Sequence, residues 1–444
     1  MRECRERMDA RERPAQSSLG RPMSAICVGV DFGTSNTVIA VMDANRGARV
    51  LSIASRGAVG TTLPSILCLR PNEVNPRDRP LSSAGVDAIA DYLARSGPAR
   101  LVQSMKSFLG SASFVDTKVF SHTYTLEALI GTLLDHLYDA SAARALIAAC
   151  PLVVGRPIEF AGATPNDALA QARLIAAFER VGRRPDQVRL EPEAAAYAFA
   201  RKARGKHLVL VADLGGGTSD FSIVEVDADH PQPAIKPLAQ TGIGIAGDRF
   251  DYAIVYNVVC PALGMGSSFT PETKPLPIPL WIYANFASWH QLSMMNNRQT
   301  LKHIAAILHT AADQHAFEGL VHVIRNDEGF SLFQAVSRVK QALTVETTAR
   351  FRFHAGPIEI DRSVSRADFE RWIAEDLARI AATADEALRV AGVTPAQITR
   401  VFMTGGSALV PAVRERFARR FGNEKLVGGD EFSSVAQGLA LMGS

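Results

Sequence analysis

The sequence predicts an α/β fold of two lobes, and a weak internal repeat is the first reason for it. Residues 26–41 and 208–226 follow one plan: an apolar strand, an aspartate, a turn rich in Gly, Thr and Ser, and a second β-rich strand. This is the pattern of a β-hairpin with a polar, glycine-rich tip. The two aspartates, Asp31 and Asp213, are separated by nearly half of the 444-residue chain. A repeat of that length predicts a duplicated domain, because solenoid repeats are much shorter.

Helices expected between and after these hairpins are the second reason. Segments with helical composition or spacing are 84–95, 125–149, 166–181, 248–259, 365–391 and the segment that opens at Glu191-Pro192. Proline is favoured in the first turn of a helix, which fixes the start of that last segment. Strands and helices that alternate along a chain predict an α/β architecture. Residues 262–330 carry four prolines between positions 271 and 279, and we expect them to be an irregular insertion.

These elements divide the chain into two expected lobes. Lobe I comprises residues 24–206 together with a returning C-terminal segment, 428–444. Lobe II comprises residues 207–427 and includes the irregular insertion around 262–330. Residues 1–23 contain six arginines but no apolar run, so we expect a disordered tail and not a secretory signal.

The composition excludes several classes of protein. The formal net charge is +3 and most of it lies in the tail, so the body lacks the basic excess of a nucleic-acid-binding domain. The five cysteines form no CxxC pair, which argues against a disulfide scaffold or structural zinc and favours reduced thiols in the cytoplasm. No apolar run reaches the length of about 18 residues that a membrane-spanning helix needs.

Two glycine-rich tips that face each other would form a clamp for phosphate groups. Glycine lacks a side chain, so backbone N–H groups can approach phosphate oxygens closely, and neighbouring hydroxyls add donors. Aspartates at the tips would repel phosphates unless Mg²⁺ lay between them. The residues of the expected clamp are Gly33, Thr34 and Ser35 at the first tip, Gly215, Gly216, Gly217 and Thr218 at the second, and Asp31, Asp213 and Asp220 around the metal.

A third glycine turn lies near the C-terminus, where an apolar strand leads into Gly405-Gly406-Ser407. Its backbone could approach a flat ligand such as adenosine. Three such turns, two of them with a matched aspartate, are far more specific than one glycine-rich hairpin.

Two other patterns give weaker indications of a binding site. Residues 242–247 match GxGxxG but lack the acid expected about 20 residues later, and the four histidines between 303 and 322 are spaced too widely for a zinc site.

These motifs resemble the signature blocks of the DnaK-type chaperones of the heat-shock protein 70 family. The blocks are Asp31-Phe-Gly-Thr-Ser-Asn36, Glu191-Pro-Glu-Ala-Ala-Ala196, Asp213-Leu-Gly-Gly-Gly-Thr-Ser-Asp220 and Thr404-Gly-Gly-Ser407, with further matches at Thr61-Thr-Leu-Pro-Ser65 and Ser104-Met-Lys-Ser-Phe-Leu-Gly110. Their order and spacing match that family's nucleotide-binding domain from Ala25 onward, and the overall pattern is similar to the short YegD-like chaperones. The resemblance implies a two-lobed, actin-like ATPase fold, with duplicated RNase H-like lobes and a central nucleotide cleft.

The resemblance also implies roles by position. Lys106, Glu191, Asp213 and Thr218 would be catalytic, and Asp31, Asp213 and Asp220 would hold Mg²⁺ and K⁺, mostly through water. Nucleotide contacts would come from Gly33, Thr34, Ser35, Asn36, Gly215, Gly216, Gly217, Gly247, Lys340, Thr344, Gly405, Gly406 and Ser407. This chain departs from the family where Ala246-Gly-Asp-Arg249 replaces Gly-Gly-Glu-Asp, and at Ser337, Gln341 and Leu409 beside the expected adenosine. These departures bear on adenine affinity.

The function expected from the sequence is a chaperone-like switch that binds ATP and ADP and hydrolyses ATP slowly. The chain ends at Ser444, where the family's peptide-binding domain would follow, so we expect that domain to be lacking. The expected protein partner is a co-chaperone or client, and neither nucleic acid nor a membrane is expected. Three alternatives stay open: a small-molecule kinase of the actin-like superfamily, a filament-forming protein, and a nucleotide sensor that does not hydrolyse.

Overall fold

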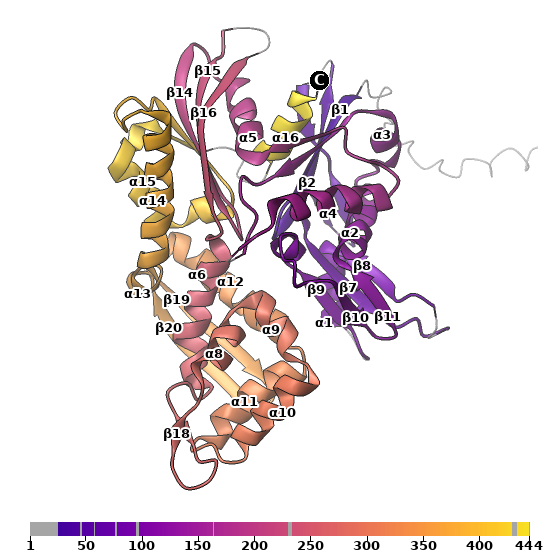
Figure 1. The fold of residues 1–444 in the computed structure, drawn as a ribbon, viewed down its shortest axis with the longest axis vertical. Helices are drawn as coiled ribbons and strands as arrows, with labels where there is room; N and C mark the ends of the chain where they lie inside the picture. The colour runs from indigo at the N-terminus through magenta and orange to yellow at the C-terminus, as the bar shows by residue number, and fades with distance from the viewer. Residues whose placement is uncertain are drawn as a thin grey trace, which may run out of the picture.

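The computed structural model describes residues 25–44, 47–56, 58–75, 78–94, 97–162, 164–229, 233–428 and 433–443. The disordered tail expected over residues 1–23 lies outside this range. Figure 1 shows two lobes joined in the upper part of the view, where two β-sheets flank the helices α5 (Glu191–Ala200) and α16 (Ser434–Met442). Within the described residues, no helix is both long and apolar enough to cross a membrane.

Two mixed β-sheets carry the architecture, and they share one strand order. The first sheet runs β13 (Gln187–Leu190), β12 (Leu152–Arg156), β1 (Ala25–Phe32), β2 (Asn36–Asp43), β3 (Gly47–Val50), with β6 (Leu63–Pro64) also paired to β2. The second sheet runs β22 (Leu426–Gly428), β21 (Arg400–Thr404), β14 (Lys206–Leu214), β15 (Ser219–Asp227), β16 (Ala234–Ile243). In each sheet three antiparallel strands are followed in the chain by two strands parallel to the first. The repeat predicted from the sequence is therefore present as two sheets of the same topology.

Helices bury both faces of these sheets. The outer face of the first sheet packs against α2 (Leu126–Ala140) and α4 (Asp167–Arg180) in one apolar core. The outer face of the second sheet packs against α14 (Ala374–Ala391) and α15 (Pro411–Phe421) in another. A third cluster lies between the sheets, where α5 and α16 meet Val153, Val209 and Val211. Burial on both faces is why the central strands are nearly continuous apolar runs.

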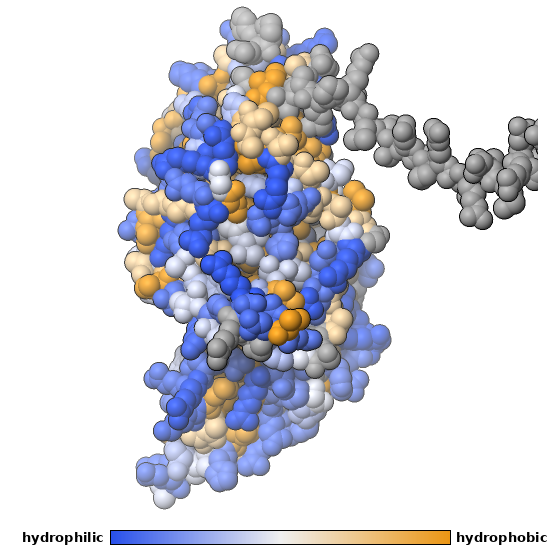
Figure 2. Space-filling view, turned by 90° about the vertical axis from the view of Figure 1, so that its right-hand side faces the viewer, coloured by the Kyte–Doolittle hydropathy of each residue, from blue (hydrophilic) through white to orange (hydrophobic). Residues whose placement is uncertain are grey.

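Smaller elements extend from each sheet and complete the lobes. In the first lobe they are β4 (Ile53–Ser55), β5 (Ala58–Gly60), β7 (Ile66–Arg70), β8 (Leu81–Ala84), α1 (Gly85–Leu93), β9 (Arg100–Gln103), the 3₁₀ helix η1 (Met105–Phe108), β10 (Asp116–Val119), β11 (His122–Thr125) and α3 (Arg144–Ala149). In the second they are α6 (Gly247–Ile254), the π-helical turn η2 (Val255–Val259), α7 (Cys260–Ala262), β17 (Ser268–Phe269), β18 (Leu276–Pro277), α12 (Gly329–Val345), β19 (Thr348–Ala355), β20 (Ile358–Ser365), α13 (Arg366–Trp372) and the 3₁₀ turns η3 (Gly406–Leu409) and η4 (Asn423–Lys425). Figure 2, which looks onto the molecule from the right-hand side of Figure 1, shows hydrophobic residues in scattered groups and a mostly hydrophilic lower part.

The predicted helices are present, but two of them are interrupted. The helix expected over 125–149 ends at Ala140 and resumes as α3, because Ala142 has a φ of 52° and the Ser141 hydroxyl bonds the Leu137 carbonyl. The helix expected over 365–391 is divided at Ile373 into α13 and α14. Pro192 lies in the first turn of α5, as the sequence predicts. The side chain of Asn166 caps α4.

The prediction that residues 262–330 are irregular is wrong. The segment contains α8 (Leu280–Ala287), α9 (Trp289–Met295), α10 (Arg298–Leu308) and α11 (Gln314–Arg325). The proline run is confined to the connection that ends at Pro279, and beyond it Ile282, Tyr283 and Phe286 recur at helical spacing on a buried face. Side chains of Asn297 and Asp313 cap α10 and α11. The prolines therefore interrupt regular secondary structure only at their own positions, and helices form in the residues that follow.

A close approach of α16 to α5 lies in the apolar cluster between the two sheets, and it gives a stability prediction. A Cβ on Gly438 would lie 1.8 Å from the Ala194 carbonyl oxygen, so Gly438→Ala must push the helices apart. We expect a loss of about 1–3 kcal/mol in the free energy of unfolding, measured by urea denaturation. Gly60→Ala is the matched control, since its added methyl group meets nothing closer than 3.8 Å. Equal stabilities for the two variants would contradict the prediction.

Candidate functional site

A cavity of about 350 Å³ lies between the lobes, where the two sheets approach each other. Its walls come from the two hairpin tips, η1, the start of α5, α6, α12, the turn after β21, and α16. Every residue that the sequence analysis assigned to the site lines this cavity except Asp220. The structure thus brings together site residues from seven separate regions of the chain.

The two glycine-rich tips face each other across the cavity. A Cβ on Gly216 would lie 2.5 Å from Oγ of Ser35, and one on Gly217 would lie 3.2 Å from Oγ1 of Thr34. Side chains at these glycines would fill the space that phosphate groups need. Ser65 supports the first tip, because its hydroxyl donates to the Gly33 carbonyl at 2.7 Å and its N–H to the Ser35 carbonyl at 2.8 Å. The two tips therefore form a cradle of backbone N–H groups and hydroxyls.

The third glycine turn is held against the second tip. Gly405 has a φ of 83°, and a Cβ there would lie 2.3 Å from the Leu214 carbonyl oxygen, so only glycine fits. Ser407 Oγ donates to the Gly215 carbonyl at 2.7 Å. The N–H of Asp248, in the first turn of α6, donates to the Gly216 carbonyl at 2.8 Å. The turn after β21 and the start of α6 are thereby fixed relative to the phosphate cradle.

A buried ion pair lies at the base of the cavity. Lys106 Nζ donates to Oε1 of Glu191 at 2.6 Å, and both side chains are buried. Lys106 stands in η1 of the first lobe, and Glu191 opens α5, where a carboxylate is favoured by the helix dipole. Burial disfavours the charged lysine, but Glu191 and Asp31 outweigh burial and raise the pKa of Lys106. The cavity floor therefore holds a permanently charged ammonium group.

The carboxylates around this lysine outnumber the cations. Asp213 and Asp220 stand directly opposite each other in the β14–β15 register. Burial, together with the charges of Glu191 and Asp220, raises the pKa of Asp213 to about 8. Burial and Glu191 also raise the pKa of Asp31, against the opposing effect of Lys106. Such a group of carboxylates, short of positive charge, fits a bound cation, which would return these pKa values toward their ordinary range.

The raised pKa of Asp213 predicts how stability depends on pH. In the unfolded chain Asp titrates near pH 3.9, so between about pH 4 and pH 8 only the folded nucleotide-free protein keeps this proton. The free energy of unfolding should therefore fall as the pH rises through this window and level off above it. Urea denaturation across the window would measure the slope, which Asp213→Asn should reduce. The exposed Asp78→Asn is the control, and an unchanged slope in the Asp213 variant would contradict the assignment.

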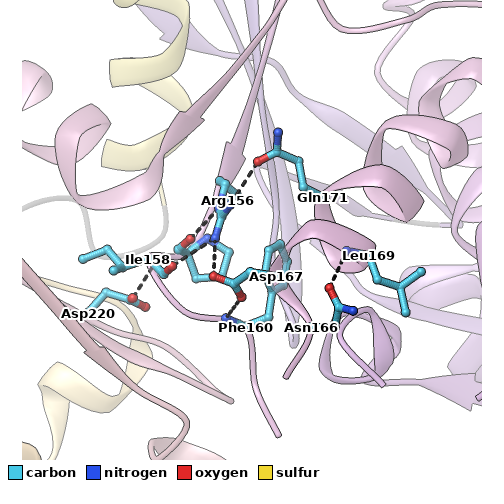
Figure 3. A network of polar contacts seen from close by, with 9 residues as sticks. Arg156, Ile158, Phe160, Asn166, Asp167, Leu169, Gln171 and Asp220 are labelled. Carbon is cyan, nitrogen blue, oxygen red and sulfur yellow. Dashed lines mark hydrogen bonds and ion pairs between the residues drawn. The ribbon is translucent and has the colours of Figure 1, made fainter. Parts of the chain in front are cut away.

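Asp220 is not among the residues that line the cavity, and it contacts the first lobe. Its Oδ1 accepts the N–H of Ile158, in the loop after β12 of the first lobe, at 3.0 Å (Figure 3). Arg156 fixes that loop by donating to the Ile158 carbonyl at 3.0 Å and to Asp167 at 2.9 Å. Asp167 in turn accepts the N–H of Phe160 at 3.2 Å. Burial and the charge of Glu191 raise the pKa of Asp220 to about 7, against donation from Thr218 and Ile158.

Direct metal ligation is not what this arrangement offers. Within the part of the chain that the structure describes, no three His, Cys, Asp or Glu side chains lie close enough to hold one ion. Asp31 and Asp213 do line the cavity beside the phosphate cradle, and carboxylates are ligands that suit Mg²⁺ with its waters retained. The role of Asp220 as a third metal residue stays a prediction, since its Oδ1 is engaged by Ile158.

Sequence reasoning missed several residues of the cavity. Asp251 pairs with Lys340 at 2.8 Å, and burial, with the charge of Asp251, raises the pKa of Asp248 to about 6. Both aspartates follow Gly247 within one helical turn, so the glycine was the signal that could have found them. The apolar lining also includes Val38, Val410 and Val435. Ser337, Gln341 and Leu409, where the sequence departs from the resembled family, all line the cavity near Lys340 and Thr344.

Comparisons with known proteins agree with this geometry. The family model described as Hsp70 protein matches residues 324–444. The chain is 26% identical over 439 aligned residues to chaperone protein DnaK from Thermus thermophilus, and the DnaK sequences of two strains of this organism match it equally well. These alignments cover 94% of this chain and 60% of DnaK, so the chain spans about three fifths of the length of these curated relatives. The chain is thus similar to Hsp70 proteins in its C-terminal region and distantly similar to DnaK along most of its length.

Proposed function

We propose that this chain binds ATP with Mg²⁺ in the cavity between its lobes and hydrolyses it slowly, as a chaperone-like nucleotide switch. The observation that carries the proposal is the buried Lys106–Glu191 pair beneath two opposed glycine tips. The matched strand order of the two sheets supports an actin-like fold with duplicated RNase H-like lobes. The similarity to Hsp70 proteins favours ATP as the nucleotide.

The proposed chemistry depends on positioning and charge. Phosphoryl transfer needs the transferred group held in place and its negative charge neutralised. We assign Lys106 to the terminal phosphate, because its ammonium group is the buried cation nearest the tips. Glu191 accepts from Lys106 through Oε1, and we assign its carboxylate to orienting the attacking water. Asp213 and Thr218 stand beside it in the second tip.

The remaining residues divide between the cation and the nucleoside. Asp31 and Asp213 would hold Mg²⁺ through its waters, and the ion would supply charge for the phosphates when bound. The proposed nucleoside contacts are Lys340, Thr344 and the turn from Gly405 to Ser407. Here the chain offers the neutral groups of Ser337 and Gln341, and the half-exposed Leu409 could pack on the base.

The proposed switch follows from where the two tips come from. Each tip belongs to a different sheet, so phosphates bound between them tie the lobes together. Loss of the terminal phosphate would loosen that tie and change the angle between the lobes. A co-chaperone or client protein would respond to this angle.

Single-turnover hydrolysis of stoichiometric Mg-ATP is the decisive experiment. Slow phosphate release without any acceptor would support the proposal. Tight ATP binding without phosphate release would contradict the proposed ATPase activity and favour a nucleotide sensor. Phosphate transfer that requires an added small-molecule acceptor would assign the chain to the kinases of the actin-like superfamily.

A further inference from the structure

A second, larger cavity lies between the lobes, apart from the nucleotide site. This groove has a volume of about 900 Å³. Its walls are β9, η1, the loop that follows and β10 in the first lobe, and α9 with the turn after α11 in the second. Figure 1 shows β10 and α9 opposite each other in the lower half of the molecule. Lys106 of η1 lines the nucleotide cavity, whereas Phe108 of the same turn lines this groove.

The groove has an apolar recess in its floor. A smaller cavity of about 70 Å³ adjoins it and shares Arg100, Phe108, Phe114, Thr117 and Met294 with it. Its inner wall consists of core side chains of the first lobe, such as Met105, Leu126 and Leu129. Met294 reaches over from the second lobe and is 40% exposed. Methionine adapts its shape to different apolar partners, which suits a recess for a bulky side chain.

The aromatic wall of the groove is held rigidly in place. Arg173, on α4 behind the wall, donates to the carbonyls of Phe108 at 3.4 Å, Ser111 at 2.9 Å and Phe114 at 2.6 Å. One buried guanidinium thus fixes the loop that presents two aromatic rings, whose centroids lie 5.3 Å apart. Rigid support of this kind is what a binding site requires and a solvent-exposed loop does not.

A local strain lies on the same wall. Phe120 has a φ of 55° in the tight turn between β10 and β11, a position that favours glycine. Holding a bulky residue in this region costs about 1 kcal/mol or more, and such strain gathers at ligand-binding positions. The turn places a third aromatic side chain, half-buried against the core, at the rim of the groove.

The charges of the groove favour an acidic ligand. Asp327 is already engaged, since it pairs with Arg100 and accepts from Asn296. Among the described residues, no ion pair is formed by Lys118 or Arg325, and both are exposed in the groove against the single carboxylate of Asp116. Two cations from opposite lobes therefore flank the apolar recess.

We propose that this groove binds an extended acidic peptide segment, with one bulky apolar side chain in the recess and a neighbouring carboxylate between Lys118 and Arg325. A central apolar anchor with a charged rim is the arrangement that concentrates binding energy in protein interfaces. The occupant would touch both lobes and, through Met105 and Phe108, the two sides of the turn that carries Lys106. This site is separate from the nucleotide cavity, and its test does not depend on ATP.

Fluorescence anisotropy tests the proposal with a fluorescein-labelled nonapeptide of alanine and glycine that carries one central leucine next to two aspartates. We expect a Kd of about micromolar, and Met294→Glu should weaken binding about tenfold or more because it places a charge over the recess. Val390→Glu, an exposed apolar position on α14 outside the groove, is the matched control and should bind like the wild type. Replacing the peptide's aspartates with asparagine should weaken its binding to the wild type but not to Lys118→Glu.

Three results would overturn the proposal. One is the absence of binding to the wild-type chain, and another is equal affinity in the Met294 and Val390 variants. The third is self-association of the wild type in sedimentation that Met294→Glu abolishes, since it would assign the groove to a second copy of the chain. Thermal unfolding followed by circular dichroism confirms that each variant is folded before its binding is measured.

Discussion

Lys106→Ala is expected to lower the single-turnover rate of ATP hydrolysis about a hundredfold or more, while ATP still binds. The ammonium group is buried against Glu191 at 2.6 Å, and the nearby Asp31 raises its pKa further. Its removal leaves Glu191 and Asp31 without their positive neighbour and the terminal phosphate without a protein cation. The carboxylates then repel the phosphate most strongly as its charge develops. Quenched-flow measurement of phosphate release, with ATP binding measured separately by calorimetry, checks both parts of this result.

Two further lysine variants distinguish catalysis from binding and from general damage. Lys340→Ala should weaken nucleotide binding more than it slows hydrolysis, because Lys340 pairs with Asp251 at the nucleoside end of the cavity. Lys202→Ala, on the exposed end that follows α5, should resemble the wild type in both measurements. A Lys106 variant that hydrolyses ATP as fast as the Lys202 variant would refute the assigned role.

Disruption of the apolar contact that joins the lobes beyond the cavity is expected to speed nucleotide release about tenfold or more. Tyr92 of α1 and Phe330 of α12 meet edge to face with their ring centroids 6.0 Å apart, and Trp289 packs beside Phe330. The Tyr92 hydroxyl also donates to the Asp327 carbonyl, and Arg100 pairs with the Asp327 side chain at 3.8 Å. An aromatic pair of about 1 kcal/mol and a hydrogen bond of similar size would both be lost when the lobes separate. The double variant Tyr92→Phe, Phe330→Ala removes both.

Stopped-flow release of a fluorescent ADP analogue measures this effect. The matched control is Tyr256→Phe, because Tyr256 stacks on Tyr252 within the second lobe and makes no contact of this kind with the described residues of the first. The hydrolysis step itself should change little, since Lys106 and Glu191 line the nucleotide cavity and neither Tyr92 nor Phe330 does. Release rates that match the control would show that these contacts do not hold the lobes closed.

Much of the site could be predicted because its chemistry is encoded in short segments. A glycine-rich tip needs only neighbouring residues, so Gly33 to Asn36 and Gly215 to Thr218 were identifiable before the fold was known. The two hairpins and the capped starts of the helices depend on local backbone preferences and are equally visible in the sequence. The resemblance then added Lys106 and Glu191, which no local pattern distinguishes from surface residues.

Local sequence patterns were insufficient where the structure depends on contacts between residues distant in the chain. Four prolines suggested an irregular segment over 262–330, but the apolar faces of α8 to α11 find a common core and fold as helices. Asp220 accepts the N–H of Ile158 in the loop after β12, a contact that the sequence analysis did not foresee, and its role as a metal residue stays a prediction. Neither these helices nor this hydrogen bond can be predicted from the spacing of residues, because each depends on a partner distant in the chain.

The sequence by itself therefore determined the repeat, the three glycine turns and the residue types that a phosphate cradle requires, since these follow from backbone freedom and side-chain chemistry over a few residues. Only the tertiary structure decided that Lys106 and Glu191 meet, that Asp248 and Asp251 join the cavity, and that a second groove opens beyond η1. The physical reason is that each of these depends on how segments distant in the chain pack together, within the first lobe for Lys106 and Glu191 and between the lobes for the cavity and the groove. That packing is a sum of many weak apolar contacts between residues far apart in the chain.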